Sequence, residues 1–170
     1  MLDRVIGVFR LDVQTFEEIE HDTTATGQAA GVVVIAAIFS GIGGALGANI
    51  AGGGVGPNFL ATLVSAVVGW VLWSWLTYVI GTGLFDGRAD LGEMLRVIGF
   101  AYAPQILAVI PCVGALVGAL WSLVAGFIAI RQGLDLDNTK AFLTVFVGFL
   151  VYVVLSVVMG LFLGGMSLFV

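Results

Sequence analysis

The sequence predicts an all-α polytopic membrane protein with five transmembrane helices, preceded by an interfacial amphipathic helix. Of its 170 residues, 60% are hydrophobic and only 10% are charged, whereas an ordinary soluble domain has about a quarter of its residues charged. The six basic and eleven acidic residues all fall within residues 3–22, 86–96 and 131–140. A spanning helix needs about 20 mostly apolar residues, and each uncharged stretch between and after these segments is longer than that.

The number of crossings follows from the lengths and flanking charges of the uncharged stretches. Residues 23–85 are long enough for two spans, and the glycine-rich run 51–58 is the only turn-like composition that can separate them. Residues 97–130 are short for two spans and long for one. A single crossing would place Arg131 and Lys140 opposite the other basic residues, so the positive-inside bias favours two crossings.

A hairpin in the second stretch requires a breaker and some additional length. Pro111-Cys112-Val113-Gly114 supplies the breaker, and the length comes from Leu91 onward, with Arg96 snorkelling to the interface. Asp90 and Glu93 have the spacing of a helix-capping pair at its start. The transmembrane domain is therefore expected over residues 23–170, with a cytoplasmic amino terminus, an outer carboxy terminus and spans at about 26–50, 59–84, 91–110, 113–130 and 141–163.

Residues 1–22 are expected to form an interfacial helix followed by an acidic linker. Apolar side chains recur there at intervals of three and four residues, which indicates an amphipathic helix: Leu2, Val5, Ile6, Phe9, Val13, Phe16 and Ile19. It is interpreted as a lid over the inner ends of the bundle or a stop for the first span. The alternative is docking of a cationic partner on four acidic residues, Glu17, Glu18, Glu20 and Asp22.

A short run in the third predicted span resembles the Yip1 family, in particular its prokaryotic members. The run is Leu95-Arg96-Val97-Ile98-Gly99-Phe100-Ala101-Tyr102-Ala103-Pro104. Arg96, Val97, Gly99 and Pro104 fit the family pattern, while Ile98 and Phe100 replace the commoner Leu and Tyr. The stretch from Phe16-Glu17-Glu18-Ile19-Glu20 into Gln28-Ala29 is similar to the start of the bacterial branch.

The resemblance implies an integral membrane protein, here of a prokaryotic cytoplasmic membrane. Eukaryotic relatives associate with Rab GTPases and vesicle traffic. Their long cytoplasmic extension and Asp-Leu-Tyr-Gly-Pro-like segment are absent from this sequence, so the Rab association is not carried over.

Pro104 is the sharpest local feature within a predicted span. Proline has no amide hydrogen and its ring displaces the carbonyl four residues earlier, so a kink is expected near Phe100. Tyr102 and Gln105 could satisfy the freed carbonyl or line a small polar cavity. Gly99, Tyr102, Pro104 and Gln105 are therefore the candidate functional kink, with a structural role as the favoured interpretation.

Small residues at four-residue intervals predict close helix packing, because backbone approach along such ridges holds helices together in lipid. Gly43 and Gly47 form such a pair on the first span. The fourth and fifth spans have longer ridges, made of Gly114, Gly118, Ser122 and Gly126 and of Ser156, Gly160 and Gly164. Packing within the chain is the favoured use, and an oligomer built on an outward-facing ridge is the alternative.

Several chemistries are not expected from this sequence. His21 and Glu17 provide two metal ligands one helical turn apart, too few for a site. No Ser, His and acid set shares a common location, so neither an enzyme nor a bound cofactor is predicted. The scattered basic residues exclude nucleic-acid binding, and a proton relay is disfavoured because no ionisable residue lies centrally in a span.

These observations favour a non-catalytic membrane protein of the Yip1 type that organises membrane or protein partners. It is expected to lie in the lipid bilayer, and its candidate protein partners are further copies of itself, in a homo-oligomer, or the members of a membrane complex. One alternative is a transporter or channel for a small neutral solute along a path near Pro104 and Gln105. The other is an accessory subunit of a larger membrane complex, in which Trp70, Trp73, Trp75 and the small-residue ridges face other subunits or pigments.

Overall fold

The computed structural model describes residues 1–50 and 59–166, and the described part is helical with no strands. The glycine-rich run 51–58, expected to separate the first two spans, lies outside the described residues. The elements in order are α1 (Leu2–Phe9), α2 (Val13–His21), α3 (Ala25–Ile50), α4 (Phe59–Phe85), α5 (Leu91–Ala101), the 3-10 helix η1 (Ala103–Val109), α6 (Val113–Gly133) and α7 (Asn138–Met166).

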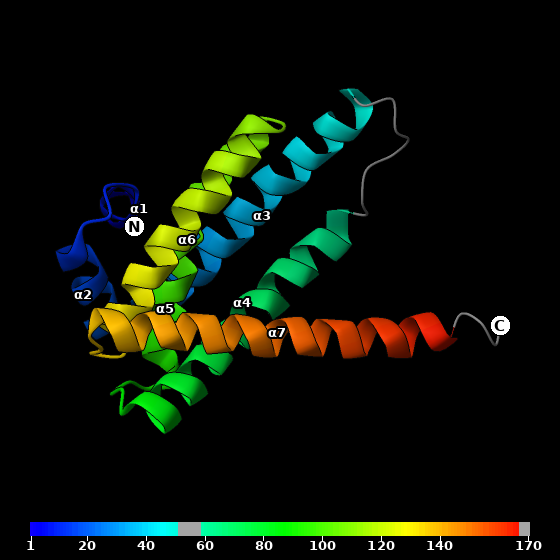
Figure 1. Cartoon of the computed structure of the whole chain (residues 1–170). Coiled ribbons are helices and arrows are strands. Elements are labelled where there is room, and N and C mark those ends of the chain that lie inside the picture. Colours follow the sequence, from blue (N-terminus) through cyan, green and yellow to red (C-terminus); the bar gives the residue numbers. More distant parts are fainter. Residues whose placement is uncertain (51–58, 167–170) are drawn as a thin grey trace.

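Among the described residues, four helices are long and apolar enough to cross a membrane: α3, α4, α6 and α7. Their bounds lie within a few residues of the four corresponding predicted spans. The prediction of an all-helical membrane protein is confirmed. α7 packs on α4 and α6 through its first half, and its carboxy-terminal half projects away from the other helices (Figure 1).

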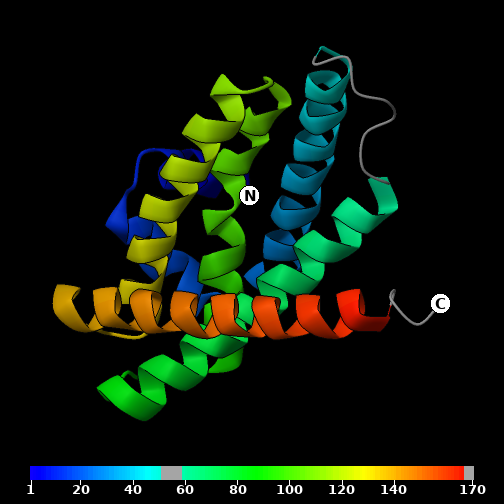
Figure 2. The same cartoon turned by 45° about the vertical axis from the view of Figure 1, so that its right-hand side comes forward.

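The third predicted span, 91–110, is not a single helix, which corrects the sequence prediction. α5 ends at Ala101, and a 3-10 helix with Pro104 in its first turn continues to Val109. Proline cannot donate the next helical hydrogen bond, and a switch to the tighter 3-10 pattern is one way to continue the chain. The change of helix type replaces the simple kink expected there. Figure 2 shows α5 and η1 as one broken column between α3 and α6.

The amino-terminal segment is two helices rather than one continuous amphipathic helix, a second correction. Leu11 has a φ of 56°, a left-handed conformation that ends α1, and the Asp12 side chain then accepts a hydrogen bond from the Gln14 amide at 3.3 Å and caps α2. Phe16 and Ile19 are fully buried in the same core as α5 and α6. The segment therefore packs as part of the bundle.

The capping prediction at α5 is confirmed in full. The Glu93 amide donates to the Asp90 carboxylate at 2.7 Å, and the Asp90 amide donates to the Glu93 carboxylate at 2.6 Å. At α7 the cap is Asp137. There the Asp137 carboxylate accepts from the amides of Thr139 and Lys140 at 2.8 and 2.9 Å.

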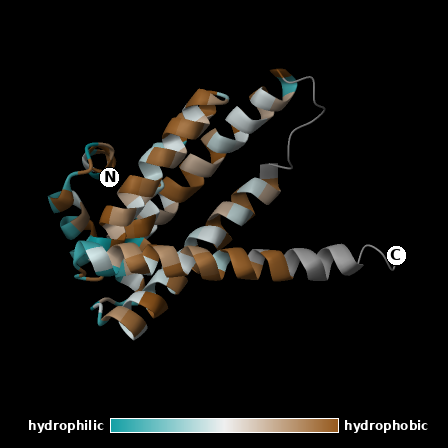
Figure 3. Cartoon of the chain, viewed as in Figure 1, coloured by the Kyte–Doolittle hydropathy of each residue, from teal (hydrophilic) through white to brown (hydrophobic). Residues whose placement is uncertain are grey.

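The charged segments gather at one end of the helical bundle. Figure 3 shows hydrophilic residues around α2, in the loop that precedes α5 and in the loop that joins α6 to α7. The Lys140 ammonium lies 3.9 Å from the Asp86 carboxylate, and the Arg88 amide donates to the Leu134 carbonyl at 2.9 Å. The loop that precedes α5 and the loop that precedes α7 are therefore in contact, on the same side of the bundle.

Candidate functional site

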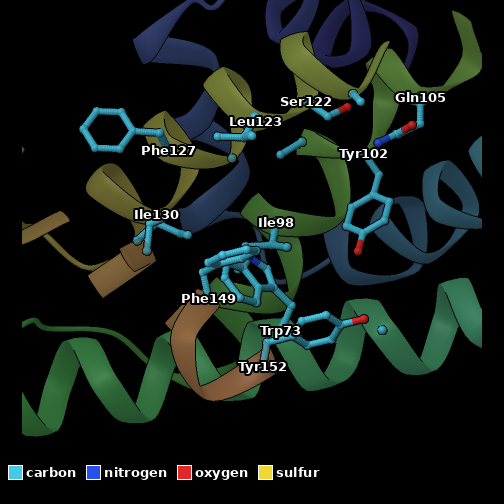
Figure 4. A pocket seen from close by; sticks show the side chains of 15 residues that line it. Trp73, Ile98, Tyr102, Gln105, Ser122, Leu123, Phe127, Ile130, Phe149 and Tyr152 are labelled. Atoms are coloured by element: carbon cyan, nitrogen blue, oxygen red, sulfur yellow. The ribbon is translucent and has the colours of Figure 1, made fainter. Parts of the chain in front are cut away.

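A cavity of about 380 Å³ lies between α4, α5, η1, α6 and α7 (Figure 4). Its wall is predominantly apolar, with aromatic side chains from α4, α6 and α7. The residues around it are Gly69, Trp73, Ile98, Ala101, Tyr102, Gln105, Ala119, Ser122, Leu123, Gly126, Phe127, Ile130, Val145, Phe149 and Tyr152. Trp73 of α4 and Tyr152 of α7 meet edge to face, with ring centroids 6.5 Å apart.

The cavity brings together polar groups from two separate segments. Tyr102 and Gln105 come from the junction of α5 and η1, and Ser122 comes from α6. The Ser122 hydroxyl is buried and has no hydrogen-bond partner within the part of the chain that the structure describes. The helix break at Pro104 therefore leaves two polar side chains beside a cavity, as the sequence analysis considered.

Gly99 and Pro104 do not line this cavity, although they were grouped with Tyr102 and Gln105. Gly99 lies where α5 contacts α3 and α4: a Cβ there would come 2.8 Å from the Ala29 Cβ and 3.0 Å from the Trp70 indole nitrogen. That nitrogen donates to the Leu95 carbonyl at 3.0 Å. Gly99 is thus a packing position that lets Trp70 reach the α5 backbone.

The first two members of the α6 glycine ridge pack inside the chain. A Cβ on Gly114 would overlap the Leu107 carbonyl oxygen of η1, and one on Gly118 would lie 2.8 Å from the Pro104 carbonyl oxygen. On the opposite side of η1, a Cβ on Gly43 of α3 would overlap the Ala108 carbonyl oxygen. Close approach at glycines on two helices therefore encloses the 3-10 segment.

The other two members of the α6 ridge remain open. Ser122 and Gly126 line the cavity, and a Cβ on Gly126 would meet nothing within 4 Å. Gly69 of α4, on another wall of the same cavity, is equally open. Ser156, Gly160 and Gly164 belong to α7, and their surroundings fall outside the described side chains.

The three tryptophans of α4 have different surroundings. Trp70 is buried and bonded to α5, and Trp73 lines the cavity. Trp75 is 47% exposed. Of the three tryptophans considered as contacts for other subunits, Trp75 is therefore the exposed one.

The four acidic residues considered for partner docking do not form one free surface. Glu17 accepts a hydrogen bond from the Gln132 amide, and Asp22 forms an ion pair with Arg4 at 2.6 Å. Glu20 is buried and only Glu18 is exposed. Glu17 thus joins α2 to α6, and Asp22 joins the end of α2 to α1.

Side chains of the bundle cap both amino-terminal helices. The last carbonyls of a helix have no partner within it, and Arg96 donates to the Glu20 carbonyl of α2 through Nε at 3.0 Å and Nη2 at 2.6 Å. Trp121 Nε1 likewise donates to the Phe9 carbonyl of α1 at 3.0 Å. Arg96, expected to snorkel toward the interface, is instead buried against α2. The signal for this contact in the sequence was a basic residue within an otherwise apolar helix face.

The carboxyl groups at the end of α2 differ in their proton affinity. Burial, followed by the nearby charge of Glu17, raises the pKa of Glu20 to about 7. The hydrogen bonds from Thr24 and Arg4 lower the pKa of Asp22 to about 2. Glu20 therefore changes charge near neutral pH, whereas Asp22 stays ionised.

The Glu20 carboxyl is expected to destabilise the folded protein progressively between about pH 4.5 and pH 7. Its raised pKa means that the folded chain keeps a proton that the unfolded chain loses near pH 4.5, so stability falls as pH rises through this window. When thermal unfolding is measured at several pH values with EDTA present, Glu20→Gln should remove the fall in stability that the wild type shows across this pH window. Glu18→Gln, at an exposed neighbour, should keep the wild-type slope, and identical slopes in all three proteins would contradict the prediction.

Comparison with protein families identifies a known domain in the chain. Residues 6–161 match the Yip1 domain. Searches among curated proteins and among solved structures gave no match. The matched range extends from α1 to α7 and includes the Arg96 to Pro104 run on which the resemblance was based. The chain belongs to the Yip1 family.

Proposed function

We propose that this chain crosses a prokaryotic cytoplasmic membrane five times, with its amino terminus inside. The broken segment supports this: at 1.5 Å per residue for α5 and 2.0 Å for η1, the two together extend about 30 Å, the thickness of a bilayer core. The gathering of the charged loops at one end of the bundle supports the same topology, because all the basic residues then share one side.

Within this topology, the proposed function is non-catalytic. The protein organises a membrane partner by binding one of the partner's transmembrane helices. The observation that supports this is the ridge of small residues on α6, of which only the first half packs against another segment of the chain. Gly114 and Gly118 hold η1, while Ser122 and Gly126 open onto the cavity. Helices in lipid associate through small residues that let backbones approach, and through hydrogen bonds from Ser or Thr. The open half of the ridge offers both.

The lining favours a helix over a solute path. The cavity wall is largely apolar and aromatic, and its polar groups, Tyr102, Gln105 and Ser122, sit beside the helix break rather than along a continuous route. An uncharged, apolar groove suits an occupant that is itself in the membrane. The Ser122 hydroxyl, which is buried and has no partner among the described residues, would gain a hydrogen bond when docking turns it toward a polar group or carbonyl of the partner helix.

Site-specific photo-cross-linking in the native membrane tests this proposal. Leu123 lines the cavity and is 64% exposed, while Leu120, one turn earlier, is 58% exposed and outside it. A photo-reactive residue at position 123 should give one discrete protein adduct, and the same residue at 120 should not. Gly126→Leu should remove the adduct by filling the groove, whereas Gly83→Leu, at an equally open site on α4 away from the cavity, should leave it.

Three results would each overturn the docking of a partner helix. The first is equal adducts at positions 120 and 123, and the second is an adduct of lipid mass only. The third is an adduct that persists in Gly126→Leu. An adduct with a second copy of the chain would support docking and identify the partner as the protein itself.

A further inference from the structure

We propose that Glu17, Glu20 and His21, at the end of α2, bind a first-row divalent metal ion such as Zn²⁺. The ligand atoms that these residues offer lie within 4.8 Å of one another. Residues three and four positions apart share one face of a helix, so α2 presents all three together. Glu17 and His21 are the pair of ligands that the sequence indicates, and the structure adds Glu20 as a third.

An unsatisfied buried carboxylate provides the second, independent observation. Glu20 is 6% exposed, and its Oε2 atom has no hydrogen-bond partner among the described residues. A buried carboxyl oxygen without a partner is costly, and a cation among Glu17, Glu20 and His21 would satisfy it.

The histidine is oriented as a metal ligand requires. Its Nδ1 lies 2.9 Å from the Glu17 carbonyl oxygen. When Nδ1 carries the proton and donates to that carbonyl, the Nε2 lone pair is free. Metal-binding histidines are commonly held by such a hydrogen bond from their other ring nitrogen. Gln132 of α6 similarly donates to the Glu17 carboxylate and leaves its second oxygen available.

The charges around the three ligands favour a cation. Asp135 and Glu93 add negative potential at Glu20. Arg96 is directed to the Glu20 carbonyl oxygen rather than to its carboxylate. One imidazole with two carboxylates suits zinc and neighbouring transition metals better than magnesium or calcium, which prefer all-oxygen sites.

Calorimetric titration of the purified full-length protein with Zn²⁺, after EDTA treatment and removal of the chelator, tests this site. The wild type should bind one Zn²⁺ ion. Glu20→Gln preserves size, and His21→Ala changes an exposed side chain. Either should weaken binding by more than about tenfold, since losing an outer-shell partner alone costs that much. Glu18→Gln, at the exposed neighbour, should bind as the wild type does.

The site is disproved if the wild type fails to bind Zn²⁺, or if Glu20→Gln and His21→Ala both retain wild-type affinity. It is also disproved if Glu18→Gln loses as much affinity as they do, since binding would then reflect general negative charge. Circular dichroism and size-exclusion chromatography should show the same fold in every variant, which separates lost ligation from lost structure.

Discussion

Gly43→Ala is expected to lower the free energy of unfolding by about 1–3 kcal/mol, the usual cost of forcing extra atoms into a packed interior. The added Cβ would overlap the Ala108 carbonyl oxygen of η1. That oxygen belongs to the backbone and cannot move aside by a change of side-chain rotamer. Relief requires α3 and η1 to separate, which would also loosen the contact of η1 with α6. Thermal unfolding in detergent measures the effect.

Gly44→Ala provides a control at the adjacent residue of the same helix. A Cβ there would meet nothing within 4 Å, so the substitution should be neutral or stabilising by up to about 1 kcal/mol, because alanine favours a helix over glycine. If both variants unfolded at the same temperature, the close approach of α3 to η1 would not be a determinant of stability.

Arg96→Met is expected to detach α2 from the bundle. The buried guanidinium makes two hydrogen bonds to the Glu20 carbonyl, and hydrogen bonds to charged groups contribute about 1.5–3 kcal/mol. Methionine keeps an unbranched apolar side chain but leaves that carbonyl uncapped. Hydrogen exchange measured by mass spectrometry should increase at the amides of α2 far more than at those of α3 or α4.

Arg88→Met is the matched control for this effect. Arg88 lies in the loop before α5 and is exposed, so its replacement removes the same charge from the same end of the protein. Exchange in α2 should stay at the wild-type level. An equal increase in both variants would indicate that net charge, and not the cap on α2, holds the amino-terminal helices in place.

The long helices could be predicted from sequence because the lengths of the apolar runs, the charges that flank them and the breakers within them determine their bounds. Charged loops, together with the breaker runs 51–58 and 111–114, located α3, α4, α6 and α7 to within a few residues. The same reasoning treated 91–110 as one helix, because apolar length does not distinguish an α-helix from a 3-10 continuation. Pro104 signalled a break, but the form of the break depends on glycines that lie distant in the chain, such as Gly43 and Gly114.

The amino-terminal segment shows a different limit of sequence reasoning. Its apolar periodicity continues through residues 9–13, so a single helix was predicted. Asp12, a favoured capping residue before Val13, was the overlooked signal for a second helix. The burial of Glu20 could not be predicted, because it depends on how α2 packs against α5 and α6. Likewise, Tyr102 and Gln105 were identified beside the break, whereas Ser122 joined them only through the three-dimensional packing of α6.

The enclosed 3-10 segment has a consequence for biogenesis. Short 3-10 helices have poorer hydrogen-bond geometry than α-helices and persist mainly in short, supported pieces, and η1 is supported by glycines of α3 and α6. If α5 and η1 cross the membrane as proposed, the segment that they form is therefore a poor candidate for independent release from the translocon into lipid. It would remain near the lateral gate until α6 emerged, and the hairpin of both would leave together to join α3.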